Sequence, residues 1–169
     1  EILSAIKERV VCDLGQLHIA CYYGCLSLRN PRVTDAANWE MPENLEKIVD
    51  AIGATSVNWS HRTECCSGSL TMARPDIAER LVEDIVTAAK RGGATAMVTD
   101  CPMCQANVES RQSKDGGPEA ALPVFYATEL IEAALSGTYP AKQQKLHLVS
   151  PAVLAGAIRG AAKREEGSV

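Results

Sequence analysis

Short extended runs alternate with longer amphipathic segments over most of this chain, and that alternation limits the folds it can adopt. The predicted strands cover residues 17–23, 54–59, 94–99 and 124–126, and the predicted helices cover residues 42–52, 75–91, 102–108 and 128–135. The segment 75–91 is typical of a helix, because Pro75 suits its first turn and Gly92 follows its end. Strands that alternate with helices predict right-handed crossovers and an α/β fold with a parallel sheet of about four strands.

Five of the seven cysteines come just after predicted strands. Cys25 follows the first strand, Cys65 and Cys66 lie in the loop after the second, and Cys101 and Cys104 follow the third. Open parallel sheets place their sites just beyond the carboxyl ends of the strands. We therefore expect the five thiols to gather at one edge of one sheet.

The arrangement of these cysteines indicates a metal or redox site. Adjacent cysteines rarely form a disulfide with each other, because their Cα atoms lie closer together than most disulfides allow. Cys101 and Cys104 form a CxxC motif, which can bind two corners of a metal site. Five thiolates exceed the four ligands of a tetrahedral zinc ion or of a cubane cluster. The adjacent Cys65 and Cys66 could therefore donate to neighbouring irons, with one sulfur bridging two metals.

Three other interpretations of the cysteines stay open. Four of the five thiolates could hold Zn²⁺ in a structural module that has no redox activity. The CxxC motif alone could act as the dithiol of a thioredoxin-like enzyme, although that site would not need three further thiols. Buried free thiols are the third possibility, since cysteine is often a small core residue. That interpretation suits Cys12 and Cys21 better than the other five.

Charge and hydropathy argue against two classes of partner. The net charge of −4 and the pI near 5.4 argue against a nucleic-acid surface, which needs clustered Lys and Arg. No stretch approaches the roughly 18 apolar residues of a membrane helix. Because no secretory signal appears, we expect a reducing, cytoplasmic location.

The length of 169 residues fits a single domain, 1–169. Within it we expect a Gly- and charge-rich loop at residues 113–118 and a flexible polar tail at about 163–169. The chain begins with Glu rather than Met, which indicates a trimmed chain or a piece of a longer protein.

The cysteine motifs resemble those of the cysteine-rich CCG domain in the number, the order and the spacing of the cysteines. The similar segments are residues 20–26 (ACYYGCL), 65–70 (CCSGSL), 100–105 (DCPMCQ) and 147–151 (HLVSP). The similarity runs from about Ile19 to Pro151 and is closer still to the carboxy-terminal half of the B subunit of heterodisulfide reductase.

This resemblance implies an oxidoreductase. A full-length member of that family carries two such motifs and two noncubane [4Fe–4S] clusters, which reduce a mixed disulfide of two thiol coenzymes. Its electrons come from partner subunits that carry iron–sulfur clusters or flavin. Carried over by motif, the expected cluster ligands are Cys25, Cys65, Cys66, Cys101 and Cys104. No catalytic residue beyond these ligands is implied.

Two departures from the family pattern affect this expectation. Ser67 stands where the family usually has Gly directly after the cysteine pair, which changes the turn or adds a hydroxyl near the cluster. Only one of the two motifs is present, so we expect the chain alone to be incomplete as a catalyst. Three side chains near the motifs, His61, His147 and Arg29, receive no role; His61 and Arg29 are expected on the surface.

Overall fold

The computed structural model describes residues 1–36, 38–112 and 121–166. Its strands are β1 (His18–Cys21), β2 (Thr55–Ser56), β3 (Ala96–Thr99) and β4 (Val124–Tyr126). Its longer helices are α1 (Ile2–Arg9), α3 (Asn44–Ala51), α4 (Pro75–Arg91), α5 (Pro102–Arg111), α6 (Ala127–Ser136) and α8 (Ala152–Glu166). Two short helices, α2 (Pro31–Thr34) and α7 (Ala141–Gln144), lie in connecting segments.

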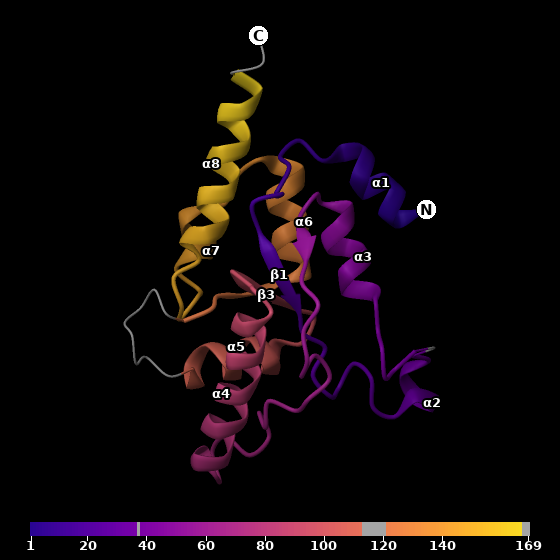
Figure 1. Ribbon diagram of the computed structural model, residues 1–169, viewed down its shortest axis with the longest axis vertical. Helices are drawn as coiled ribbons and strands as arrows, with labels where there is room; N and C mark the ends of the chain where they lie inside the picture. The colour runs from indigo at the N-terminus through magenta and orange to yellow at the C-terminus, as the bar shows by residue number, and fades with distance from the viewer. Residues whose placement is uncertain (37, 113–120, 167–169) are drawn as a thin grey trace.

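The strands form one parallel sheet in the order β2-β1-β3-β4 (Figure 1). Ile19 of β1 pairs with Ala96 of β3, and Val98 of β3 pairs with Phe125 of β4. The predicted α/β class, with about four parallel strands and helical crossovers, is therefore confirmed. The second strand is much shorter than the predicted span 54–59, since only Thr55 and Ser56 pair regularly with β1.

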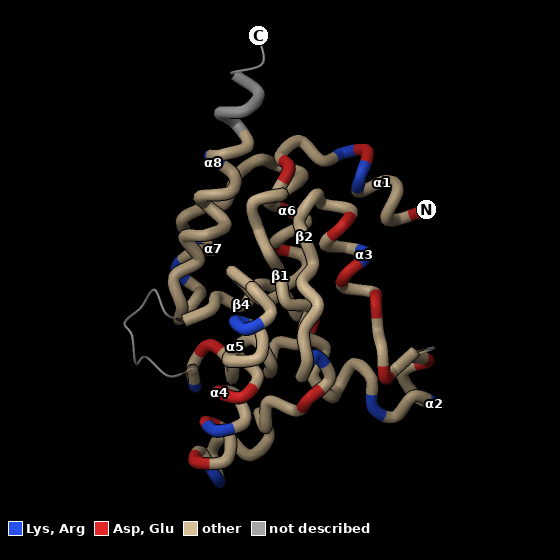
Figure 2. The backbone as a smooth tube through the Cα atoms, viewed as in Figure 1, with Lys and Arg blue, Asp and Glu red and all other residues tan. Residues whose placement is uncertain are grey.

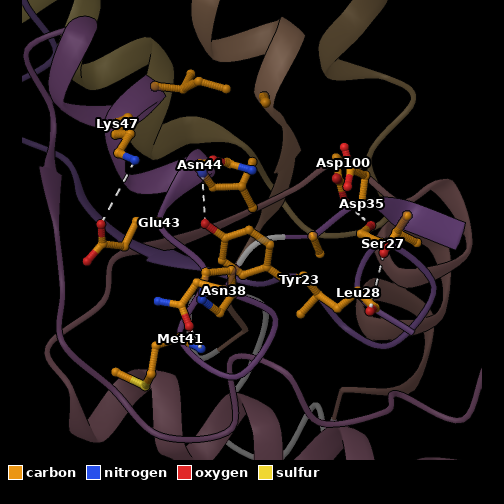
Figure 3. A pocket seen from close by; sticks show the side chains of 16 residues that line it. Tyr23, Ser27, Leu28, Asp35, Asn38, Met41, Glu43, Asn44, Lys47 and Asp100 are labelled. Carbon is orange, nitrogen blue, oxygen red and sulfur yellow. Dashed lines mark hydrogen bonds and ion pairs between the residues drawn. The ribbon is translucent and has the colours of Figure 1, made fainter. Parts of the chain in front are cut away.

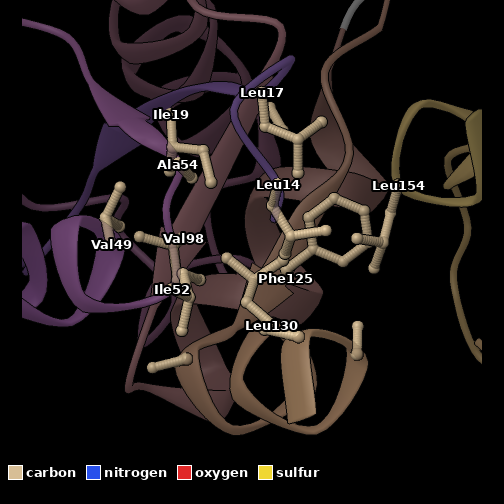
Figure 4. Packing of buried hydrophobic residues seen from close by; sticks show 14 of the residues in the cluster. Leu14, Leu17, Ile19, Val49, Ile52, Ala54, Val98, Phe125, Leu130 and Leu154 are labelled. Atoms are coloured by element: carbon tan, nitrogen blue, oxygen red, sulfur yellow. The ribbon is translucent and has the colours of Figure 1, made fainter. Parts of the chain in front are cut away.

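Helices cover both faces of the sheet and create two apolar cores. On one face, Ile19, Val98 and Phe125 pack with Leu14, Leu17 and Ile52 and with Leu130 and Leu154 from α6 and α8 (Figure 4). On the other face, Ala20, Met97 and Val124 meet Val82, Ile85 and Val86 of α4 and Val108 of α5. Alternate residues of each strand point to opposite faces, so both faces of a parallel sheet can be buried.

Four helices lie where the sequence pattern predicts no element: α1, α2, α7 and α8. Helix α1 has no buried residue of its own, which explains its weak apolar signal. The backbone of α8 continues to Glu166, into the segment where a polar tail is expected, and residues 167–169 of that segment lie outside the described residues. The expected loop at 113–118 also lies outside them.

No helix among the described residues has the length and hydropathy needed to span a bilayer.

Candidate thiol site

Three loops at the carboxyl edge of the sheet carry the five motif cysteines. Cys25 lies in the turn that follows β1, where Gly24 adopts a left-handed φ of 61°. Cys65 and Cys66 lie in the loop between β2 and α4. Cys101 is the residue before α5, and Cys104 lies in the first turn of that helix. The strands are parallel, so their ends meet at the same edge, as the sequence predicts.

The thiols form a series of two close sulfur pairs that are linked through neighbouring cysteines. Cys25 Sγ lies 3.6 Å from Cys65 Sγ, and Cys66 Sγ lies 3.8 Å from Cys104 Sγ. Cys65 and Cys66 are neighbours in the chain, and Cys101 interacts electrostatically with Cys104. The described residues contain no group of three His, Cys, Asp or Glu side chains placed to hold a single metal ion.

The site is closed on one side and open on the other. Cys66, Cys101 and Cys104 are buried, whereas Cys25 and Cys65 are half-buried. Leu26 and Met103, each next to a motif cysteine in the sequence, are exposed. A group bound by the five thiols would therefore be reached from the side of Cys25 and Cys65.

The buried thiols of Cys66 and Cys104 are coupled. The hydrogen bond between them lowers the pKa of the Cys66 thiol to about 6, in spite of burial, and the Gly68 N–H, Asn107 and Tyr22 act in the same direction. The same hydrogen bond, together with burial, raises the pKa of Cys104. These interactions favour the thiolate of Cys66, the form of cysteine that binds metals.

Burial also raises the pKa of Cys25, and its contact with Cys65 acts in the same direction. Arg29, an exposed residue as expected, opposes this shift with its positive charge.

Backbone groups approach the thiols closely at two turns. A Cβ atom at Gly24 would lie 2.8 Å from Cys104 Sγ, so a side chain at that position would displace the thiol. Ser67 has a φ of 62°, in the left-handed region that favours glycine, and its N–H donates to Cys65 Sγ at 3.3 Å. Ser67 thus has a backbone conformation that glycine favours, at the position where the family usually has Gly. The turn thus directs two N–H groups at the thiols, that of Ser67 at Cys65 and that of Gly68 at Cys66.

Two side chains other than those of the cysteines hold these loops in place. The Tyr22 hydroxyl donates to the Glu64 carbonyl at 2.7 Å, and Asn107 Nδ2 donates to the Cys66 carbonyl at 2.6 Å. Both contacts join segments about forty residues apart in the chain, so no local pattern predicts them. The one available signal is that Asn107 lies three residues after Cys104, on the same side of α5.

The other two cysteines lie apart from this site. Cys21 belongs to the core on the opposite face of the sheet, where burial raises the pKa of its thiol. Cys12 is buried in the same core, and its sulfur lies 4.0 Å from the Ile158 carbonyl. Both positions match the expectation that these two residues are buried thiols.

The histidines also lie outside the thiol series. His18 and His61 are exposed, and His61 contacts only the Ser60 hydroxyl among the side chains described. His147 is buried between two carboxylates: Nδ1 lies 2.8 Å from Glu109 and Nε2 lies 3.3 Å from Glu129. Burial opposes its charge, but these two hydrogen bonds outweigh burial and raise the pKa of His147 to about 9. We refer to these three residues as the Glu–His–Glu network.

Comparison with known proteins agrees with the cysteine pattern. The family model of the CCG cysteine-rich domain matches residues 19–109. The 8-methylmenaquinol:fumarate reductase membrane anchor subunit of Wolinella succinogenes is 30% identical over 148 residues, which cover 86% of this chain and 51% of that protein. The B subunit of the ferredoxin:CoB-CoM heterodisulfide reductase of Methanosarcina mazei is 24% identical over 135 residues, which cover 77% of this chain and 45% of that protein.

The B subunit of a ferredoxin/F420H2-dependent CoB-CoM heterodisulfide reductase, from Methanosarcina acetivorans, is 25% identical over 124 residues. These residues cover 70% of this chain and 41% of that protein. The chain thus spans about half the length, or less, of the curated relatives that it matches.

Proposed function

The chain belongs to the CCG cysteine-rich domain family, and on that basis we propose that it is a redox iron–sulfur domain of a heterodisulfide reductase-like complex. The proposed cofactor is a noncubane [4Fe–4S] cluster bound by Cys25, Cys65, Cys66, Cys101 and Cys104. The proposed activity is reduction of a disulfide, or electron relay to another redox subunit. The relatives are oxidoreductase subunits, which supports an iron–sulfur role in an oxidoreductase.

The observation that carries this proposal is the series of five neighbouring thiols. Its two close sulfur pairs, joined through the adjacent Cys65 and Cys66, offer more donors than one tetrahedral ion can use. Because Gly24 has no side chain, its backbone can lie close to Cys104 Sγ without a steric clash. The residues present therefore fit an iron–sulfur group: the donors are thiols, there are enough of them, and the backbone at Gly24 leaves room beside Cys104.

The protein's own groups would bind, orient and tune such a cluster. A bound cluster would supply electron transfer to or from a sulfur compound. The lowered pKa of Cys66 favours its thiolate, which is the form that binds iron. The Ser67 N–H stabilises negative charge on Cys65, and the half-buried Cys25 and Cys65 leave one side open to a disulfide.

We propose that the domain works with partner subunits that carry iron–sulfur clusters or flavin, in the cytoplasm. The relatives come from multisubunit reductases, and this chain matches only about half of each. A second motif is a feature of the family that the 169 residues of this sequence do not contain. The isolated domain should therefore bind its cluster but be inactive as a disulfide reductase on its own.

Metal and sulfide analysis tests the proposal most directly. Protein purified and reconstituted without oxygen should contain about four irons and four acid-labile sulfides per chain. It should be brown and should bleach on reduction. About one zinc per chain without iron, in colourless protein, would contradict the redox role and favour a structural zinc module.

A further inference from the structure

A separate pocket of about 530 Å³ lies beside the thiol site (Figure 3). Its walls come from the first turns of α3, from the segment between α2 and α3, and from the loops that follow β1 and β3. Ser27 and Asp100 belong to its lining and are joined by a hydrogen bond of 2.8 Å. Ser27 lies two residues after Cys25, and Asp100 directly precedes Cys101, so the pocket borders two of the cysteine loops.

The floor of this pocket is apolar. Leu28, Leu45 and Ala127 are buried, and the half-buried Ile48 lies beside them in the lining. A volume of this size fits a small organic molecule, and these buried apolar side chains favour a ligand that has an apolar body. The floor therefore sets the shape and polarity of the part of a ligand that enters deepest.

The mouth of the pocket carries net negative charge. Asp35, Glu43 and Asp100 line it and are exposed, whereas Lys47 is the one cationic side chain in the lining. Lys47 forms an ion pair with Glu43 at 4.0 Å, which leaves the two aspartates without an opposing cation in the lining. Figure 2 shows that acidic positions predominate on α3 and on the segment that leads into it.

The amino terminus of α3 does not reverse this charge. Its Leu45 N–H already donates to the Tyr23 hydroxyl at 2.8 Å, and that hydroxyl in turn donates to Glu46. The N–H group of Leu45 is therefore engaged, and a second carboxylate stands in the first turn of the helix. An anion placed at this mouth would meet carboxylates rather than unpaired donors.

We propose that this pocket binds a small organic cation: an ammonium or guanidinium group at the acidic mouth, attached to an apolar body on the floor. The carboxylates attract and orient the cation, and the apolar floor holds the rest of the ligand. The proposal does not depend on the cofactor of the thiol site. It predicts selectivity by charge: a polyanionic molecule of the same shape is repelled.

Two probes with one apolar body and opposite heads test this selectivity. We would titrate the full chain with 2-phenylethylammonium and with 2-phenylethanesulfonate and follow backbone amide signals by NMR. The cation should shift the signals of Leu28, Leu45, Ile48 and Ala127 saturably, and the sulfonate should not. Equal shifts with both probes, or no saturable shift with the cation, overturn the proposal.

Charge variants locate the binding to this mouth. Asp35→Asn combined with Asp100→Asn should weaken binding of the cation about tenfold or more, since each exposed charge contributes up to about fivefold. Lys47→Gln should strengthen binding, because it removes the opposing charge. The matched control is Asp84→Asn, an exposed carboxylate on α4, across the sheet. A loss with Asp84→Asn as large as with the double variant overturns the proposal.

The signals of α8 residues report whether each variant keeps the fold. The Lys47→Gln result stands independently of that check, because a gain in affinity cannot arise from unfolding. Unchanged or weaker binding in folded Lys47→Gln counts against the proposal. The titration is run on protein with and without cluster, so a failure of the cofactor assignment leaves this test interpretable.

Discussion

The thiol site and the Glu–His–Glu network are both clusters of ionisable side chains, but their groups are partnered in opposite ways. In the network, both oxygens of Glu109 accept hydrogen bonds, from His147, the Val124 N–H and the Leu148 N–H. Glu129 accepts from the Tyr126 N–H and from His147. Each charge faces an opposite charge or a backbone donor, so this network is complete without a ligand.

At the thiol site, by contrast, sulfur atoms mainly face other sulfur atoms. If all five were ionised, like charges would repel one another at less than 4 Å, so the thiols must share protons or bind a cation. A buried polar cluster with matched partners thus stabilises the fold, whereas a cluster of like donors indicates a site for a bound group. Four sets of substitutions test this contrast.

Removal of a thiolate should have the largest effect. Cys66→Ser should abolish most of the iron bound per chain, because Cys66 links the two sulfur pairs, while the circular dichroism spectrum stays close to that of the parent protein. The control is Cys21→Ser, which alters a buried thiol in the other core. Iron content that is equal in the two variants would remove Cys66 from the proposed ligand set.

The network predicts a stability change with pH. The folded pKa of His147 is about 9, above its usual value of 6.5, so its stabilising effect is complete below about pH 6.5 and is lost as pH rises through 9. The loss should be roughly 3 kcal/mol in the free energy of unfolding. Urea unfolding at pH 6 to 10 measures it.

His147→Gln should flatten this pH dependence, and His18→Gln, which changes an exposed histidine, should leave it unchanged. A profile that keeps its slope above pH 8 in His147→Gln would assign the effect to another group. Iron bound per chain should not change in His147→Gln, since the network is complete without the thiol site.

Glycine substitutions separate backbone strain from contact with sulfur. Gly24→Ala and Gly93→Ala both place a side chain at a positive φ, 61° and 84°, and each should lose about 1–2 kcal/mol of stability. The alanine methyl would lie 2.8 Å from Cys104 Sγ at Gly24 and meets nothing within 4 Å at Gly93. Iron binding should therefore fall in Gly24→Ala alone. A similar fall in both variants would mean that strain, not contact with the thiol, weakens the site.

Ser67→Gly should have the smallest effect, and the opposite sign. Ser67 holds a left-handed φ of 62°, and glycine adopts that conformation freely, so the variant should gain about 1 kcal/mol in stability. Urea unfolding measures the gain. Iron content should be unchanged, because the N–H that donates to Cys65 belongs to the backbone and remains. A loss of stability would show that the serine side chain contributes to the turn.

The helix 75–91 and the strand 124–126 have the bounds that their patterns predict, because both carry strong local signals at their ends. Helix α8 lacks such a signal, because most of its apolar residues are alanines and because Gly156 and Gly160 interrupt it. The second strand is shorter than its pattern predicts because regular pairing with β1 stops at Ser56, and the Val57 N–H makes the last backbone hydrogen bond to that strand, to the Ile19 carbonyl. How many residues pair there depends on the path of the following loop.

The amino-acid sequence was sufficient to predict the parallel α/β fold and the gathering of five thiols at one edge of the sheet. The fold follows from the alternation of strands and helices, and the gathering of the thiols follows from the position of each cysteine after a strand. Both kinds of information are local along the chain. The tertiary structure was needed to show that Cys25 faces Cys65, that Cys66 faces Cys104, and that His147 lies between Glu109 and Glu129. These contacts join residues 18 to 40 positions apart, and their geometry depends on how three loops pack against one another.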